Sequence, residues 1–170
     1  TGEESVTGTS AKLKLSFNHP VKELVWVAQR DVVIDGDNNQ AGNQWSNYTT
    51  VTADDTANAA DPSSDSARAL NNVDGAKLQL NGQDRFAFRT GRYFNLVQPY
   101  QAHTNIPESP GINVYSFALK PEDHQPSGSA NFSRIDNATL NLDLIPSNDG
   151  YKVRVYGVNY NVLRVMSGMG

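Results

Sequence analysis

Three histidines are the side chains best suited to metal binding or general-base chemistry in this chain: His19, His103 and His124. None has a second histidine at the i, i+4 spacing that places two metal ligands on one helix face. His124 follows Glu122 and Asp123 in a turn flanked by prolines, so exposure or simple hydrogen bonding explains it better than ligation. The other acidic residues are scattered, without a pair whose settings suggest separate acid and base roles.

Nucleophilic catalysis has equally little support in the sequence. A Ser-His-Asp triad is assembled in space, so spacing alone does not decide the question. However, the chain lacks a nucleophile elbow of the Gly-x-Ser-x-Gly type. The C-terminal Gly168-x-Gly170 is too short for a phosphate loop and follows a strand pattern without a helix. We therefore expect a protein that is not an enzyme and that uses no cofactor and no metal.

Three segments match the acceptor pattern for N-glycosylation, beginning at Asn47, Asn131 and Asn137. The pattern is short and arises often by chance. Asn131 and Asn137 lie in or beside a compact Asn131–Asp136 block, where a structural role is the better interpretation. Asn47 lies in a long polar segment and is the one candidate glycosylation site.

Composition favours one acidic domain. The chain has 170 residues, a net charge of -4 and no cysteine, so packing must supply its stability. An acidic chain does not suit a nucleic-acid surface, which needs a clustered basic face. No apolar run approaches the ~20 residues that cross a bilayer. The start at Thr1 and the end at Gly170 look cut, and we expect a fragment of a longer protein.

Period-two alternation recurs along the chain and indicates an all-β domain. Clear examples are Leu13–Phe17, Leu78–Leu80 and Ala138–Leu144, and Leu24–Ala28 is apolar on both faces, as in a central strand. Asn81-Gly82 predicts a hairpin turn. The count is about seven strands, and a jelly roll has eight, so we expect the eighth upstream of Thr1.

Three further segments have their own predictions. Residues 151–166 read as one long strand, bent or bulged near Gly157. Tyr93–Tyr100 predicts one short helical turn, because Pro99 disfavours helix at the preceding residue. Residues 31–75 are polar and acidic, which predicts a long loop. That loop is either a tolerated insertion or an outward loop. Trp26 is expected in the core, and Trp45 is expected to cap the loop or to pack against a neighbouring subunit.

Three blocks in this order resemble the double jelly-roll major capsid proteins of large eukaryotic DNA viruses. They are Tyr93–Gln101, Gly111–Asp136 and Tyr160–Gly168. The resemblance implies that residues 1–170 form the second, C-terminal jelly-roll domain of a capsid subunit. It further implies a homotrimer of pseudo-hexagonal outline, an icosahedral shell assembled in the host cytoplasm, contacts with neighbouring capsomers and minor capsid proteins, and neither direct nucleic-acid binding nor membrane insertion.

The expected structural residues come from two of these blocks: Pro99, Tyr100, Phe132, Arg134, Ile135 and Asp136. Arg134 and Asp136 are two apart, so an extended backbone would project them to one face. The simple interpretation is a solvated pair worth ~0–1 kcal/mol. We favour a partly buried pair beside two apolar anchors, Phe132 and Ile135. The alternative function is a carbohydrate-binding module or lectin with Tyr93, Phe94 and Tyr100 as a sugar platform, but we expect these rings to pack internally.

Overall fold

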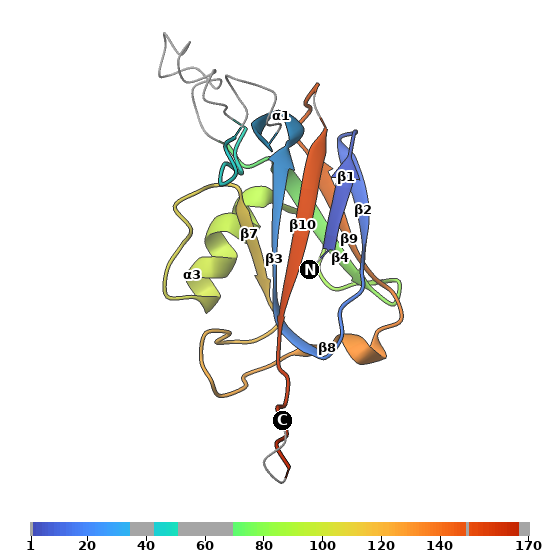
Figure 1. Cartoon of the computed structure of the whole chain (residues 1–170), viewed down its shortest axis with the longest axis vertical. Coiled ribbons are helices and arrows are strands. Elements are labelled where there is room, and N and C mark those ends of the chain that lie inside the picture. Colours follow the sequence, from blue (N-terminus) through green and yellow to red (C-terminus); the bar gives the residue numbers. More distant parts are fainter. Residues whose placement is uncertain (1, 35–42, 51–69, 149, 167–170) are drawn as a thin grey trace.

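The computed structural model describes residues 2–34, 43–50, 70–148 and 150–166. Two antiparallel sheets pack face to face in an elongated sandwich, with one helix beside the edge at β7 (Figure 1). The first sheet has the order β1 (Gly2–Val6), β10 (Tyr151–Asn159), β3 (Pro20–Arg30) and β7 (Ile112–Ser116), and β8 (Ala130–Asn131) also pairs with β3. The second has the order β2 (Ser10–Leu15), β9 (Ala138–Leu144), β4 (Val73–Leu80) and β5 (Gln83–Asp84), and β6 (Arg89–Thr90) also pairs with β4.

This arrangement confirms the predicted all-β jelly-roll sandwich. Each sheet contains a path of four strands, so the two paths supply the eight strands of a jelly roll within the described residues. The count of seven was too low because it missed β1, whose sequence is polar apart from Val6, its one buried residue. The eighth strand is therefore not needed upstream of Thr1. The predicted hairpin turn is present: Asn81 and Gly82 have φ values of 50° and 80° and connect β4 to β5.

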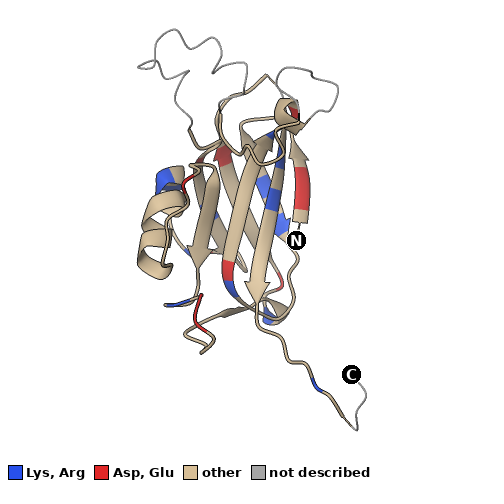
Figure 2. Ribbon diagram, turned by 60° about the vertical axis from the view of Figure 1, so that its left-hand side comes forward, with Lys and Arg blue, Asp and Glu red and all other residues tan. Residues whose placement is uncertain are grey.

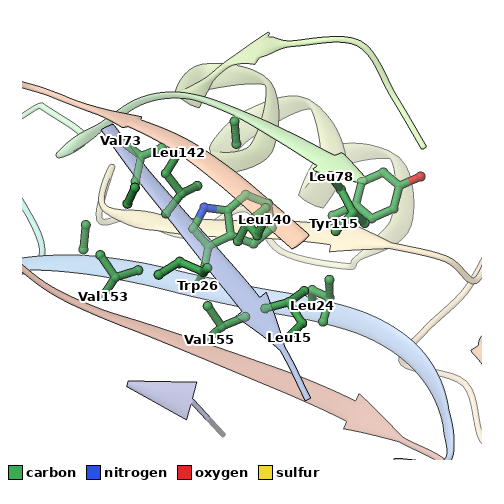
Figure 3. Packing of buried hydrophobic residues seen from close by; sticks show 14 of the residues in the cluster. Leu15, Leu24, Trp26, Val73, Leu78, Tyr115, Leu140, Leu142, Val153 and Val155 are labelled. Atoms are coloured by element: carbon green, nitrogen blue, oxygen red, sulfur yellow. The ribbon is translucent and has the colours of Figure 1, made fainter. Parts of the chain in front are cut away.

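The alternation of buried and exposed residues along the strands places one apolar face of each sheet in the core. In β2 the exposed and buried positions alternate strictly, and β9 pairs with β2 on one side and β4 on the other. Leu140 of β9 and Leu78 of β4 lie opposite each other and are fully buried. Trp26 of β3 lies between the sheets, as expected (Figure 3). The sandwich is thus held by two apolar inner faces that exclude water.

The helix closes the core with an aromatic side chain. Residues 91–102 are helical and comprise a π-helical segment, η2 (Tyr93–Val97), and the helix α3 (Gln98–Ala102). Phe94 of this helix is fully buried, with its ring centroid 5.0 Å from that of Trp26 and 5.3 Å from that of Phe86. These tilted ring contacts attach the helix to both sheets.

Two sequence predictions about long segments need correction. The strand expected over 151–166 ends at Asn159. The irregularity predicted near Gly157 is present as a register shift between Val158 and Asn159. Gly157 itself lies close to the ring of Phe17, against which a side chain at this position would press. Beyond Tyr160, the chain leaves the sheet.

The polar loop expected at 31–75 is shorter than predicted at both ends. The short helix α1 (Asp31–Ile34) follows β3 directly and buries Val33 and Ile34. At the other end, Thr49 and Asn71 form a β-bridge, and β4 begins at Val73. Residues 35–42 and 51–69, which carry most of the predicted loop, lie outside the described residues.

The loop formed by residues 43–50 approaches β7 so closely that only glycine fits at position 111. A Cβ atom on Gly111 would overlap the carbonyl oxygen of Tyr48. We predict that Gly111→Ala lowers the free energy of unfolding by ~1–3 kcal/mol, as forced overpacking does, measured by thermal or urea denaturation. Gly8→Ala is the control, because nothing lies within 4 Å of a Cβ there. Equal stability of the two variants would contradict this contact.

Candidate assembly surfaces

The Asn131–Asp136 block packs a phenylalanine into the base of the sandwich. Phe132 is 4% exposed and belongs to the 3-10 helix η3 (Phe132–Arg134). Its ring makes edge contacts with Phe17 at 5.7 Å and Phe117 at 6.0 Å between centroids. Ile135 is half-buried against the same cluster. The expected apolar anchors are therefore both in contact with the core.

The same block holds the turn between β2 and β3. The amide of Phe132 donates to the carbonyl oxygen of His19 at 3.3 Å, and the amide of His19 donates to the Ser133 hydroxyl at 3.0 Å. The side chain of Asn131 caps η3 by accepting from the Ser133 amide at 3.1 Å. His19 has a positive φ of 67°, which non-glycine residues adopt rarely. These reciprocal bonds offset the strain of that turn, and the sequence analysis missed the role of His19.

The prediction that Arg134 and Asp136 form a partly buried pair is wrong. Both residues are exposed, and no ion pair joins them within the described residues. The prediction assumed an extended backbone, whereas Asn131 caps a 3-10 turn that ends at Arg134. The side chains two apart therefore do not share a strand face. The Asn-x-Ser sequence, which favours such local side-chain-to-backbone bonds, was the signal for this turn.

The helix over 91–102 is longer than the single turn predicted around Pro99. Gln98 precedes Pro99 yet has helical dihedrals, φ −62° and ψ −48°. Two side-chain hydrogen bonds hold it there: its Nε2 donates to the Tyr93 hydroxyl of the same helix at 2.9 Å, and its Oε1 accepts from the Ser116 amide of β7 at 3.2 Å. The local preference of a residue before proline is therefore overridden by contacts to β7.

The outer surface of this helix is apolar. Pro99 is buried, but Tyr100 is 77% exposed and does not pack internally as expected. Leu96, Val97 and Phe88 are also exposed, and Arg89 and Arg92 flank them. We call Phe88, Leu96, Val97 and Tyr100 the helix face. Leu96 and Tyr100 are four apart, the spacing that places two residues on one side of a helix, and this spacing was the signal that the sequence analysis did not use.

Buried amides hold a second surface at the opposite end from the Phe132 cluster. Gln29 Nε2 lies within 3.0 Å of the carbonyl oxygens of Trp45 and Asn47, and its Oε1 accepts from Arg154 at 2.8 Å. Asn72 donates from its Nδ2 to the carbonyl oxygens of Ala28 and Tyr48. These bonds fix residues 43–50 on the sandwich and leave Trp45 exposed. Trp45 thus lies on an ordered loop, free to contact a neighbour.

The candidate glycosylation site is part of this loop. Asn47 accepts from the Thr49 amide and hydroxyl through Oδ1, at 3.0 and 2.8 Å. Its Nδ2 donates to Gln44 Oε1 at 2.8 Å. An attached glycan would replace one hydrogen on this nitrogen. Asn131 and Asn137 are exposed and lie beside structural bonds, since Asn131 caps η3 and the Asn137 amide donates to Asn81 Oδ1.

The ionisable side chains make local links. His103 Nε2 lies 2.7 Å from Glu23 Oε2, and both side chains are mostly buried, so the pair ties the end of α3 to β3. His124 is exposed. Burial raises the pKa of Tyr115, and the positive charge of Arg85 opposes that rise. No cluster of three or more potential metal-binding side chains occurs in the described ranges.

We predict that the loss of the Phe132 ring and the loss of the Arg134 charge differ sharply in their effects on the free energy of unfolding. Phe132→Ala should lower the free energy of unfolding by ~3–5 kcal/mol, because a buried aromatic ring is lost. Arg134→Ala, the control in the same turn, should change it by less than ~0.5 kcal/mol, as exposed substitutions do. Chemical denaturation measures both. A large loss in Arg134→Ala together with a small one in Phe132→Ala would contradict the observed geometry.

Comparisons with known proteins agree with this architecture. Residues 2–170 match the family described as large eukaryotic DNA virus major capsid protein. The major capsid protein of Phaeocystis pouchetii virus is 44% identical over an alignment that covers all of this chain and 46% of the relative. That of Pyramimonas orientalis virus is 45% identical and covers all of this chain and 39% of the relative. The chain therefore spans less than half the length of these relatives.

Solved structures give the same result at the level of the fold. A quasi-atomic model of the PBCV-1 virus capsid aligns with 99% of this chain and 48% of its own chain, at a TM-score of 0.71 and 33% identity. The Faustovirus major capsid protein has a TM-score of 0.72 over 93% of this chain and 33% of its own, and at 14% identity it supports the fold alone. The sequence match across residues 2–170 decides the assignment: this chain belongs to the large eukaryotic DNA virus major capsid protein family.

Proposed function

We propose that the chain is the second of two tandem jelly rolls in a capsid subunit, and that three subunits form a pseudo-hexagonal capsomer that tiles an icosahedral shell. The family match over residues 2–170 is the observation that carries this proposal. The resemblance to a capsid structure at a TM-score of 0.71 supports it. The fact that the chain spans less than half of its relatives leaves room for a first jelly roll.

The proposed mechanism is geometric. Two sheets packed through one apolar core form a stiff block whose surface loops and edges keep fixed positions. Such a block positions the same contacts in every copy, and closed symmetry then repeats them. Each contact can be weak, because many act together once several subunits have met.

The helix face is the surface best suited to contact another jelly-roll domain. Phe88, Leu96 and Val97 line one surface hollow, Tyr100 follows Leu96 by four residues on the same helix, and all four are exposed. Exposed apolar groups that lie together mark interaction sites more often than isolated ones. Their support is rigid, because Phe94 and Gln98 of the same helix are held in the core and against β7. We therefore assign the helix face to a contact within the capsomer.

The proposal also covers the loop that carries Trp45 and Asn47. We propose that residues 43–50 face outward from the shell, with the exposed Trp45 available to a neighbouring capsomer or minor capsid protein. Asn47 is the candidate for a glycan on that face. We propose no catalytic activity, no cofactor and no direct contact with nucleic acid. We also propose that the subunits assemble in the host cytoplasm and reside in the virion. In the described residues, no helix is long and apolar enough to cross a membrane.

The lectin alternative is not supported. The family match is to capsid proteins, and two of the three aromatic residues suggested as a sugar platform pack inward. Phe94 is fully buried, and the Tyr93 ring lies 5.1 Å from it in an edge contact. Of the three aromatic residues, Tyr100 is the exposed one, and a single ring does not make an aligned platform.

Substitutions on the helix face test the capsomer contact. In the full-length capsid protein, Leu96→Asp should reduce the trimer fraction at least about tenfold, because a buried charge without a partner is costly. Thermal melting of the subunit should not change, since Leu96 is exposed in this domain. Leu96→Met is the matched control and should assemble normally. Size-exclusion chromatography with light scattering measures the trimer. Normal trimer in Leu96→Asp would contradict the assignment.

The capsid proposal itself is tested on purified virus particles. Quantitative mass spectrometry should find peptides of this chain among the most abundant in the particle, because a shell protein is present in many copies. Negative-stain microscopy of the same particles should show an icosahedral outline. Particles that contain only trace amounts of these peptides would contradict a shell function.

A further inference from the structure

The turn between β4 and β5 carries the one Asn-Gly pair of the sequence, Asn81-Gly82. Both residues have a positive φ, 50° and 80°, and both are exposed. A Cβ atom on Gly82 would have nothing within 4 Å, so the turn projects into open space. Because glycine has no side chain and a flexible backbone, its nitrogen can approach the side-chain amide of the preceding asparagine without obstruction.

The fold polarises the side-chain carbonyl of Asn81. The Asn137 amide donates to Asn81 Oδ1 at 3.0 Å, and the Asn81 amide donates to the carbonyl oxygen of Asn137 at 2.6 Å. A hydrogen bond to Oδ1 stabilises the negative charge that a nucleophile attacking Cγ would place on this oxygen. Within the described residues, Nδ2 of Asn81 makes no hydrogen bond, so no contact retains it as a leaving group.

The backbone nitrogen after Asn81 is available, whereas the one after Asn131 is engaged. Among the residues that the structure describes, the Gly82 amide has no hydrogen-bond acceptor. Asn131 also has a hydrogen-bonded side-chain carbonyl, which accepts from the Ser133 amide at 3.1 Å. However, the amide that follows it belongs to Phe132 and donates to a backbone carbonyl oxygen at 3.3 Å. The two asparagines therefore differ in the nucleophile.

We propose that Asn81 deamidates in the folded protein through a succinimide formed with Gly82. The Gly82 nitrogen gives up its proton and bonds to Cγ of Asn81. The bond from Cγ to Nδ2 breaks, and Nδ2 leaves as ammonia with that proton. Water then opens the succinimide ring. Cleavage between the ring nitrogen and Cγ gives aspartate, and cleavage between that nitrogen and the backbone carbonyl carbon gives isoaspartate.

The two products have different effects on the turn. Aspartate keeps a side-chain oxygen that can accept from the Asn137 amide. Isoaspartate places Cβ in the main chain, so the turn becomes longer and the acceptor moves away from Asn137. The lost bond is the one that ties the turn to the residue before β9, a strand with neighbours on both sides. We therefore expect isoaspartate, and not aspartate, to loosen this end of the second sheet.

Either product adds one negative charge to a chain whose net charge is -4. Acidic residues already lie at several separate places on the domain (Figure 2). In the proposed shell the reaction would recur in many copies, so electrostatic repulsion between copies would grow with the age of the particle. The reaction itself depends on the turn alone. Its absence would leave the capsid assignment standing, because particle composition tests that assignment.

Peptide mapping of the folded full-length capsid protein, incubated at mildly alkaline pH, tests the site. Conversion of Asn81 should be at least about tenfold faster than conversion of Asn131, the internal control whose following amide is engaged. Liquid chromatography with mass spectrometry separates the asparagine, aspartate and isoaspartate peptides. The rate should rise with pH, because the Gly82 nitrogen must lose its proton. Equal rates at the two asparagines would overturn the proposal.

The variant Gly82→Asn separates the succinimide route from direct hydrolysis of the side chain. Asparagine tolerates a positive φ better than most residues, so the turn should form, but the added side chain obstructs ring closure. Conversion of Asn81 should fall at least about fivefold. A melting curve checks the fold of the variant. An unchanged rate in the folded variant would contradict the succinimide, and the comparison of Asn81 with Asn131 stands whether or not this variant folds.

Thermal melting tests the effect of the two products. The isoaspartate form, isolated by chromatography, should melt roughly 2–4 °C lower, as the loss of one hydrogen bond predicts for a domain of this size. Asn81→Asp is the matched control, since it adds the same charge and keeps the acceptor, and it should melt like the unaltered protein. Identical melting of the isoaspartate form and Asn81→Asp would overturn the structural effect assigned to isoaspartate.

Discussion

The packing of Phe94 against Trp26 is the contact on which the rest of the structure depends. Trp26 lies in β3, which pairs with β10, β7 and β8, so its ring is fixed by the first sheet. Phe94 comes from the helix and also contacts Phe86, which follows β5. One aromatic cluster therefore joins the two sheets and the helix. Because interiors are close-packed, the position of the inner ring also sets the position of the exposed side chains on the same helix.

Buried amides perform the corresponding role at one end of the sandwich. Gln29, Asn72 and Asn113 are fully buried, and burial of an amide is costly unless its hydrogen bonds are made. Gln29 and Asn72 bond to the backbone of residues 44–49, and Asn113 bonds to Asn71 Oδ1 through Nδ2 at 3.4 Å. These bonds make the loop geometry specific as well as stable. A rigid loop end is what a repeating shell contact requires.

Sequence patterns predicted the parts of the fold in which burial alone decides the structure. Alternation located β2, β4 and β9, and the double-sided apolar run located β3. The polar strand β1 escaped detection, because an edge strand with one buried residue has no alternation to find. Gln98 and Arg134 were mispredicted for a different reason: distant contacts in the first case and a capped 3-10 turn in the second replaced the assumed local geometry.

The candidate surfaces were less predictable than the core. Phe132 and Ile135 were identified as anchors because they are apolar residues in a polar segment. The exposure of Tyr100, Leu96 and residues 161–166 was not predicted, since an apolar residue at a subunit contact has the same sequence pattern as one in the core. Only the fold shows which of these side chains the domain leaves uncovered.

The central claim is that this domain is a rigid shell component whose exposed apolar surfaces are covered by other capsid domains. A cryo-electron microscopy map of the purified particle, at a resolution that shows side chains, tests it most directly. The account predicts this sandwich as the second jelly roll of each subunit, with density from another domain packed against Leu96 and Tyr100. A map in which this domain is absent from the shell, or in which both side chains face solvent, would contradict it.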